Sequence, residues 1–194
     1  MVVMVADCNH QYDIVIVLDL SGSVADYNSY ILMVNLTRSI INGFDIDNKL
    51  VRIGVLTYDT NPNDQFYLNK YSTREEIIQA ISFNHNGGST GTQKALARVQ
   101  STYFTNTNGD RSGIANVVIL VSDGMSDIPE GSSPSANAAS KLKSTGATII
   151  TISLGDIADQ NEMITISSDS DHVFSLDSST DYITVASDVD TFLC

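Results

Sequence analysis

Runs of apolar and β-branched residues recur along the chain, and each is short enough to form one strand. They show little alternation with polar residues, which is typical of strands buried on both faces of a parallel sheet. A weaker segment, Phe66–Lys70, is a candidate edge strand. Buried strands are predicted at Tyr12–Asp19, Val51–Tyr58, Asn116–Ser122, Ala147–Leu154 and His172–Leu176.

Helical periodicity occupies the segments between these strands. The first helix is predicted from one apolar stripe, formed by Tyr30, Met33, Val34, Thr37, Ile41 and Phe44. Further helices are predicted at Glu75–Ile81, Thr92–Phe104, Ser135–Ser144 and Ser179–Leu193. This alternation predicts an α/β fold, in which a doubly wound, mostly parallel six-stranded sheet carries helices on both faces and one short antiparallel edge strand.

One domain is predicted over residues 8–194, because no linker or internal repeat interrupts the pattern. Residues 1–7 are set apart as a trimmed leader or an expression remnant, since they lack the positive start of a signal peptide. Hydrophobic residues make up 42% of the chain and charged residues 17%, which is a globular composition. No apolar run approaches the ~20 residues needed to span a bilayer, so no membrane partner is expected. The isolated domain is expected to be monomeric.

The formal net charge of −13 opposes binding to phosphate backbones, so nucleic acid is excluded as an expected partner. The charge is uneven, because no Lys or Arg follows Lys143. The acids beyond that point are Asp156, Asp159, Glu162, Asp169, Asp171, Asp177, Asp181, Asp188 and Asp190. They indicate either a solvated acidic face or a surface that attracts Ca²⁺, a basic partner or a mineral.

The two cysteines of the chain, Cys8 and Cys194, lie near its ends. Domain termini are often close in space, so a disulfide between them is predicted, worth ~5 kcal/mol on a chain-entropy estimate. Such a bond implies an oxidising compartment and therefore secretion, whereas two free thiols are the alternative.

A glycosylation sequon begins at Asn35, which is also consistent with secretion. Asn28, Asn35 and Asn42 recur every seventh residue, so they are predicted to share one polar helix face. The sequon is therefore expected to be exposed, although so short a pattern also arises by chance.

Side chains with oxygen donors follow two of the predicted strands. The loop after Tyr12–Asp19 continues through Ser21, Gly22 and Ser23, and Asp123 directly follows Asn116–Ser122. In open α/β sheets, ligands bind outside the carboxyl ends of the strands, where the strand order reverses. If the two strands are neighbours, their loops surround one point at that edge.

All of these donors are hard oxygens, and neither Cys nor His is among them. They suit Mg²⁺, Mn²⁺ or Ca²⁺ better than Zn²⁺ or Cu²⁺. The alternate spacing of Asp19, Ser21 and Ser23 lets three side chains point the same way, and Gly22 permits the turn. Few formal charges would leave the metal electrophilic, so a further anionic oxygen would come from outside.

This pattern resembles the metal-ion-dependent adhesion site of von Willebrand factor A domains. That family has D-x-S-x-S after its first strand, a Thr before a helix and an Asp after its central strand. The matching positions here are Asp19, Ser21, Ser23, Thr90 and Asp123. The resemblance extends over almost the whole chain, through VRIGVLTYDT, ITISLGDIADQNEMITISSDSDHVF and the closing ITVASDVDTFLC. It is strongest to the extracellular-matrix branch, such as matrilin, collagen VI and thread or shell matrix proteins.

The resemblance implies a secreted adhesion or matrix module that is not an enzyme. A partner's Asp or Glu would complete the metal's coordination, and collagen is the leading ligand. The resemblance also implies that Asp123 acts through water in the liganded state. Two departures lie beside Thr90: Ser89 stands where relatives often have Gly, and Gly91 is expected to loosen the loop.

Three other interpretations compete with this one. Asp19, Ser21 and Ser23 alone would also suit the start of a helix, where such residues cap backbone N–H groups. A structural matrix module would bind through its acidic surface and leave the metal idle. A haloacid-dehalogenase-type phosphatase also has an Asp after its first strand, but Ser21 here replaces its general acid and no catalytic Lys is evident.

Overall fold

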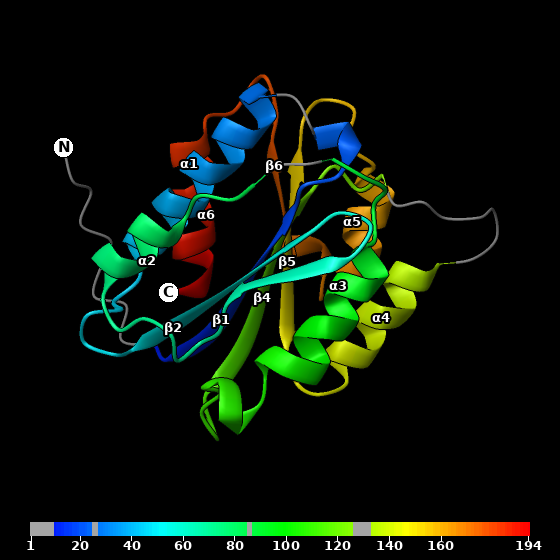
Figure 1. The fold of residues 1–194 in the computed structure, drawn as a ribbon. Coiled ribbons are helices and arrows are strands. Elements are labelled where there is room, and N and C mark those ends of the chain that lie inside the picture. The colour runs from blue at the N-terminus through cyan, green and yellow to red at the C-terminus, as the bar shows by residue number, and fades with distance from the viewer. Residues whose placement is uncertain (1–9, 25–26, 85–86, 126–132) are drawn as a thin grey trace.

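The computed structural model describes residues 10–24, 27–84, 87–125 and 133–194. Its strands are β1 (Tyr12–Asp19), β2 (Val51–Tyr58), β3 (Pro62–Phe66), β4 (Ala115–Ser122), β5 (Thr148–Leu154) and β6 (Val173–Leu176). They form one six-stranded sheet in the order β3-β2-β1-β4-β5-β6. All neighbours pair in parallel except β3, which is antiparallel to β2 (Figure 1). The predicted doubly wound sheet with one antiparallel edge strand is confirmed.

The edge strand β3 lies earlier in the chain than predicted. It spans Pro62–Phe66, so the prediction of Phe66–Lys70 is wrong in position. The chain reverses directly after β2, where the Asp59 carboxylate accepts the backbone N–H of Asn61 at 3.1 Å. Pro62 lacks an N–H, which an edge strand tolerates at its first residue. Leu68, which lies within the predicted range, is outside any strand and is buried in a cluster with Ala95 and Leu96.

The helices are α1 (Tyr27–Gly43), α2 (Arg74–Ala80), α3 (Thr92–Arg98), α4 (Pro134–Lys143), α5 (Gln160–Ile166) and α6 (Tyr182–Leu193). The helix predicted over Thr92–Phe104 is confirmed to within one residue, although α3 continues as a π-helical turn at Val99–Tyr103. Periodicity did not reveal α5, which has only 7 residues, although the family resemblance implied a helix there. Asp159 caps α5 by accepting two backbone N–H groups of its first turn.

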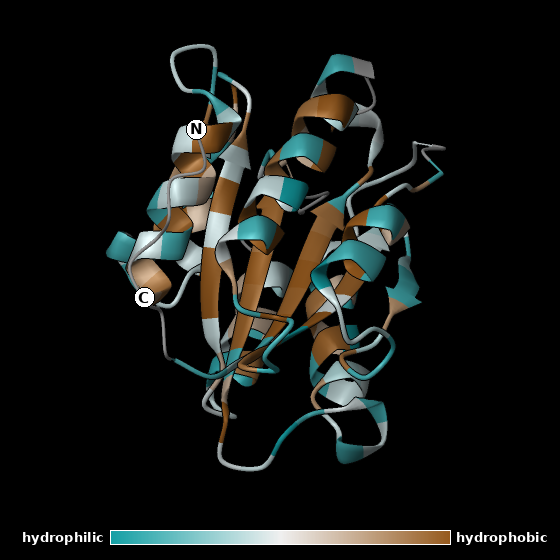
Figure 2. Ribbon diagram, turned by 90° about the vertical axis from the view of Figure 1, so that its left-hand side faces the viewer, coloured by the Kyte–Doolittle hydropathy of each residue, from teal (hydrophilic) through white to brown (hydrophobic). Residues whose placement is uncertain are grey.

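Two separate apolar cores lie on the two faces of the sheet. Helices α1, α2 and α6 cover one face, and α3, α4 and α5 cover the other (Figure 1). Because side chains alternate along a strand, Ile14, Ile16 and Leu18 enter the first core, whereas Val15 and Val17 enter the second. Figure 2 shows the apolar strands behind helices whose polar residues face outward. The continuous apolar runs in the sequence reflect this burial on both faces.

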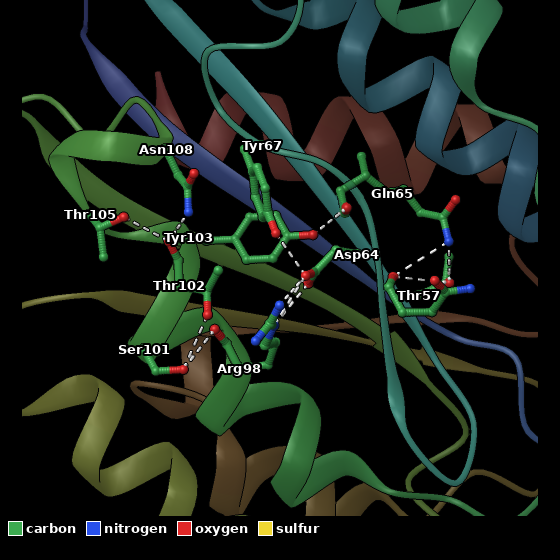
Figure 3. A network of polar contacts seen from close by, with 12 residues as sticks. Thr57, Asp64, Gln65, Tyr67, Arg98, Ser101, Thr102, Tyr103, Thr105 and Asn108 are labelled. Atoms are coloured by element: carbon green, nitrogen blue, oxygen red, sulfur yellow. Dashed lines mark hydrogen bonds and ion pairs between the residues drawn. The ribbon is translucent and has the colours of Figure 1, made fainter.

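A polar network fastens the carboxyl end of α3 to the β2–β3 hairpin (Figure 3). The Arg98 guanidinium forms an ion pair with Asp64, and its Nε lies 3.1 Å from each carboxylate oxygen. Tyr67 donates to the same carboxylate at 2.8 Å, and the buried Tyr103 donates to the Val55 carbonyl at 2.7 Å. The hydrogen bonds from Arg98 lower the pKa of Asp64. This network holds α3 in place against the edge of the sheet.

Helices α1 and α6 approach each other closely where Gly43 meets Asp190. A Cβ atom at Gly43 would lie 1.7 Å from Asp190 Oδ2, so only glycine fits there while the carboxyl keeps its position. We predict that Gly43→Ala lowers the free energy of unfolding by about 1–3 kcal/mol, because the Asp190 side chain must move in a packed interface. An exposed Gly→Ala change in a helix would normally raise stability instead. Urea denaturation of both proteins tests this, and equal or higher stability of the variant would contradict it.

The sequon at Asn35 is less accessible than predicted. Asn28 and Asn42 are exposed, but Asn35 is half-buried. Thr37 is fully buried and donates its hydroxyl to the Met33 carbonyl at 2.8 Å. The expectation of an exposed sequon is wrong for its threonine, because Thr37 also belongs to the apolar stripe that faces the core.

Cys194 is disulfide-bonded at the end of α6. Cys8, the other cysteine of the chain, lies outside the described residues. Among the helices that the structure describes, none is both long and apolar enough to cross a membrane.

Candidate metal centre

The carboxyl ends of β1 and β4 lie side by side at one edge of the sheet, with Leu18 opposite Val121. Asp19 is the last residue of β1, and Asp123 directly follows β4. Both side chains are buried, at 0% and 4% exposed. The strand order reverses between these two strands, so the predicted carboxylates lie where open α/β sheets bind ligands.

Hydrogen bonds fix both oxygens of the Asp19 carboxylate. Its Oδ1 accepts the backbone N–H of Ser21 at 2.9 Å. Its Oδ2 accepts the hydroxyl of Ser122 at 2.7 Å and that of Tyr58 at 3.1 Å. The Ser21 side chain also hydrogen-bonds this carboxylate, which lowers its pKa against the effect of burial.

The two serines of the loop after β1 point toward each other. Their hydroxyl oxygens are 3.2 Å apart, with Ser21 buried and Ser23 exposed. Between them, the Gly22 N–H donates to the Gly88 carbonyl at 2.8 Å. This bond attaches the β1 loop to the segment that carries Thr90.

Thr90 is 6% exposed and lies just before α3. Next to it, the Gly91 N–H donates to the Asp59 carbonyl at 2.8 Å. A Cβ at Gly91 would lie 2.8 Å from the carbonyl oxygens of both Asp59 and Thr60. The expectation that Gly91 loosens this loop is therefore wrong, because the glycine permits close backbone packing that holds Thr90.

Asp123 is held from two sides. Its carboxylate Oδ1 accepts the Met125 N–H at 3.0 Å. Its carbonyl accepts the Asp159 N–H at 2.8 Å, which connects the loop after β4 to the start of α5. The next residue, Gly124, donates its N–H to the Ser122 hydroxyl at 3.1 Å.

The site is electrostatically unfavourable without a cation. Burial raises the pKa of Asp19, and the nearby charge of Asp123 adds to the increase, while hydrogen bonds from Ser21 and Ser122 oppose it. Burial and the charge of Asp19 also raise the pKa of Tyr58 well above its ordinary value. In the described ranges, the ion pairs are Arg98–Asp64 and Arg111–Asp13, so no basic side chain pairs with Asp19 or Asp123.

The donor chemistry of the site fits a hard divalent cation. Carboxylate and hydroxyl oxygens are the ligands that Mg²⁺, Mn²⁺ and Ca²⁺ prefer. The described residues contain no cluster of three or more His, Cys, Asp or Glu side chains, so any metal here would depend on hydroxyls as well. A cation would also relieve the repulsion between Asp19 and Asp123.

Sequence reasoning missed Tyr58, Ser122 and Thr92. The Tyr58 hydroxyl lies 3.2 Å from Thr92 Oγ1 in addition to its bond with Asp19. Tyr58 and Ser122 are the last residues of β2 and β4, at the edge where the ligand site was predicted. The signal available in the sequence was a polar residue at the carboxyl end of a buried strand, where the ligand site was expected.

Comparisons with known proteins identify relatives of this chain. The profile of the von Willebrand factor type A domain family matches residues 13–188. Integrin alpha-1 of Gallus gallus is 36% identical over 124 residues, which cover 63% of this chain and 42% of the integrin. The collagen alpha-5(VI) chain of Homo sapiens is 34% identical over 155 residues, which cover 78% of this chain and 6% of the collagen.

A solved structure has the same fold over nearly the whole chain. It is proximal thread matrix protein 1 from the mussel byssus, in which zinc occupies the metal-ion-dependent adhesion site (MIDAS) motif. It has a TM-score of 0.85 and 25% sequence identity, covering 96% of this chain and 48% of the mussel chain. The chain thus spans less than half the length of each of these three proteins.

Proposed function

Because the chain belongs to the von Willebrand factor type A domain family, we propose that it is an extracellular adhesion or matrix module that binds a protein through a divalent metal. The proposed metal ligands are Asp19, Ser21, Ser23, Thr90 and Asp123. The observation that carries the proposal is the burial of Asp19 beside Asp123 with no basic side chain paired to either among the described residues. Buried carboxylates of this kind are paired or bind a metal.

Mg²⁺ is the proposed metal, with Mn²⁺ or Ca²⁺ as substitutes, because all proposed donors are hard oxygens. The zinc in the mussel relative supports a divalent metal in general. When bound, the metal supplies a positive centre with an open position for a carboxylate oxygen of the partner. Ser21, Ser23 and Thr90 contribute neutral oxygens, so no more than two carboxylates oppose the charge of the metal. The metal therefore still attracts an acidic ligand.

The proposed partner is an extracellular matrix protein that presents an Asp or Glu side chain, and collagen is the leading candidate. Similarity to an integrin alpha chain and to a collagen VI chain supports a role in contacts between cells and matrix. The proposal includes no catalytic step, no nucleic acid and no membrane insertion, and the isolated domain is proposed to be a monomer. Similarity to integrin and collagen VI chains supports an adhesion or matrix module over a phosphatase.

Secretion, a Cys8–Cys194 disulfide and a glycan at Asn35 complete the proposal. The disulfide-bonded state of Cys194 and the presence of one other cysteine support the pairing. The half-buried position of Asn35 requires that a glycan there extend away from the α1 face that enters the core.

A second candidate function is a structural module that binds through its acidic surface, with Ca²⁺, a basic partner or a mineral as its ligand. One observation favours it. No Lys or Arg follows Lys143, and neither described ion pair involves the acids of that last part of the chain. This binding would weaken with salt and would not depend on a particular metal.

Binding of the domain to immobilised fibrillar collagen, in Mg²⁺ and again in excess EDTA, tests the proposal. We predict binding in Mg²⁺ that EDTA abolishes. Binding that survives EDTA would move the contact to another face and favour the acidic-surface function. No binding in either buffer would remove collagen as the partner, and the metal site would then be tested by direct metal binding.

A further inference from the structure

The Asp19 carboxylate connects the chain segments that carry the other proposed metal ligands. Its Oδ2 accepts the hydroxyls of Ser122 and Tyr58, and neither residue is among the proposed ligands. Ser122 and Tyr58 are each 1% exposed. Two buried hydroxyl groups therefore converge on one oxygen at the carboxyl edge of the sheet.

Each hydroxyl joins Asp19 to a different segment. The Ser122 hydroxyl donates to Asp19 Oδ2 at 2.7 Å and accepts the Gly124 N–H at 3.1 Å, so it bridges β1 to the loop that contains Asp123. The Tyr58 oxygen lies 3.1 Å from Asp19 and 3.2 Å from Thr92 Oγ1, so it bridges β1 to the first residue of α3. Thr90 lies two residues before that point.

We propose that Ser122 and Tyr58 are positioning residues that hold the three metal-binding segments in register before the metal arrives. The inference rests on the metal site of the proposed function and adds the device that assembles it. By engaging Oδ2, the two hydroxyls fix the orientation of the carboxylate, so that Oδ1 faces the β1 loop and accepts the Ser21 backbone N–H. Groups that orient metal ligands in this way typically contribute 10–100-fold to metal affinity.

The chain offers a matched control for each residue. Ser153 is paired with Ser122 in the sheet register and is 1% exposed, but its hydroxyl bonds Ser175 at 2.9 Å and not Asp19. Tyr103 is fully buried, and its hydroxyl donates to the Val55 carbonyl. Ser153→Ala and Tyr103→Phe therefore remove buried hydroxyls of the same kinds without touching the site.

The experiment is a titration of the whole domain with Mn²⁺, with free Mn²⁺ measured by electron paramagnetic resonance. We expect Ser122→Ala and Tyr58→Phe to weaken Mn²⁺ binding about tenfold. Ser153→Ala and Tyr103→Phe are expected to bind within about twofold of the wild type, and Ser122→Thr to recover most of the lost affinity. Urea unfolding without metal shows that each variant is folded at the titration temperature.

Two results would overturn the inference. Unchanged Mn²⁺ affinity in both Ser122→Ala and Tyr58→Phe would show that the hydroxyls do not position the site. Equal weakening in the Ser153→Ala control would show a general effect of lost buried hydroxyls. A wild-type domain that binds no Mn²⁺ would instead refute the metal site of the proposed function, so the two failures are distinguishable.

Discussion

Replacing Thr90 with alanine is expected to abolish metal-dependent ligand binding while the fold survives. The change deletes one proposed neutral ligand and leaves Asp19 and Asp123 in place. We expect Mn²⁺ affinity to fall by at least about 100-fold, because even groups that only orient ligands contribute 10–100-fold. The free energy of unfolding without metal should change by less than about 2 kcal/mol, the scale of one lost hydrogen bond.

Thr90→Ser is the matched control, because it keeps the hydroxyl and removes only a methyl group. It is expected to bind Mn²⁺ within a few-fold of the wild type. Asp19→Ala should behave like Thr90→Ala in the binding assay. If Thr90→Ala and Asp19→Ala both retain metal-dependent binding, the adhesion-site assignment is wrong for this protein.

Asp190 is expected to make the protein less stable as the pH rises from about 4 to about 8. Its side chain is 3% exposed between α6 and α1, and Oδ1 has no hydrogen-bond partner. Burial raises the pKa of Asp190 from 3.8 to about 8, with no contribution from a neighbouring charge. Between these two values the folded protein keeps a proton that the unfolded chain has released, so each rise in pH favours unfolding.

Asp190→Asn should remove this dependence, because the amide keeps the shape of the carboxyl group and cannot ionise. The variant should match the wild type near pH 4 and exceed its free energy of unfolding by roughly 2–5 kcal/mol at pH 8. Urea denaturation across this range measures the difference between the two proteins. Asp188→Asn, on the exposed face of the same helix, is the control and should leave the pH profile unchanged. If the free energy of unfolding of Asp190→Asn depends on pH in the same way as that of the wild type, the prediction is contradicted.

The buried strands were predictable because burial on both faces requires consecutive apolar residues. The bounds of β1 and β2 match the predicted Tyr12–Asp19 and Val51–Tyr58, since most positions of each strand are apolar or β-branched and are buried. The edge strand β3 lacks such a run, and its position depends on the turn at Asp59. Its misplacement at Phe66–Lys70 follows from that difference.

The metal-site residues were predicted from spacing and from family resemblance, and their role as ligands stays a proposal. The placement of Asp19 and Asp123 at one edge needed only the rule that parallel strands present their carboxyl ends together, plus the condition that β1 and β4 are neighbours. The path of the loop that carries Thr90 was less predictable. Gly91 packs against the backbone of Asp59 and Thr60, which no local pattern indicates.

By itself, the sequence determined the order of the buried strands and of the longer helices, the parallel sheet, and the residue types gathered at its carboxyl edge. These follow from periodicity and from the direction of the chain, which are local properties. Only the tertiary structure decided that Ser122 and Tyr58 both donate to one oxygen of Asp19, and that Asp190 is buried against Gly43. Such contacts join residues far apart in the chain, and they depend on distances and burial that arise only when the helices pack on the sheet.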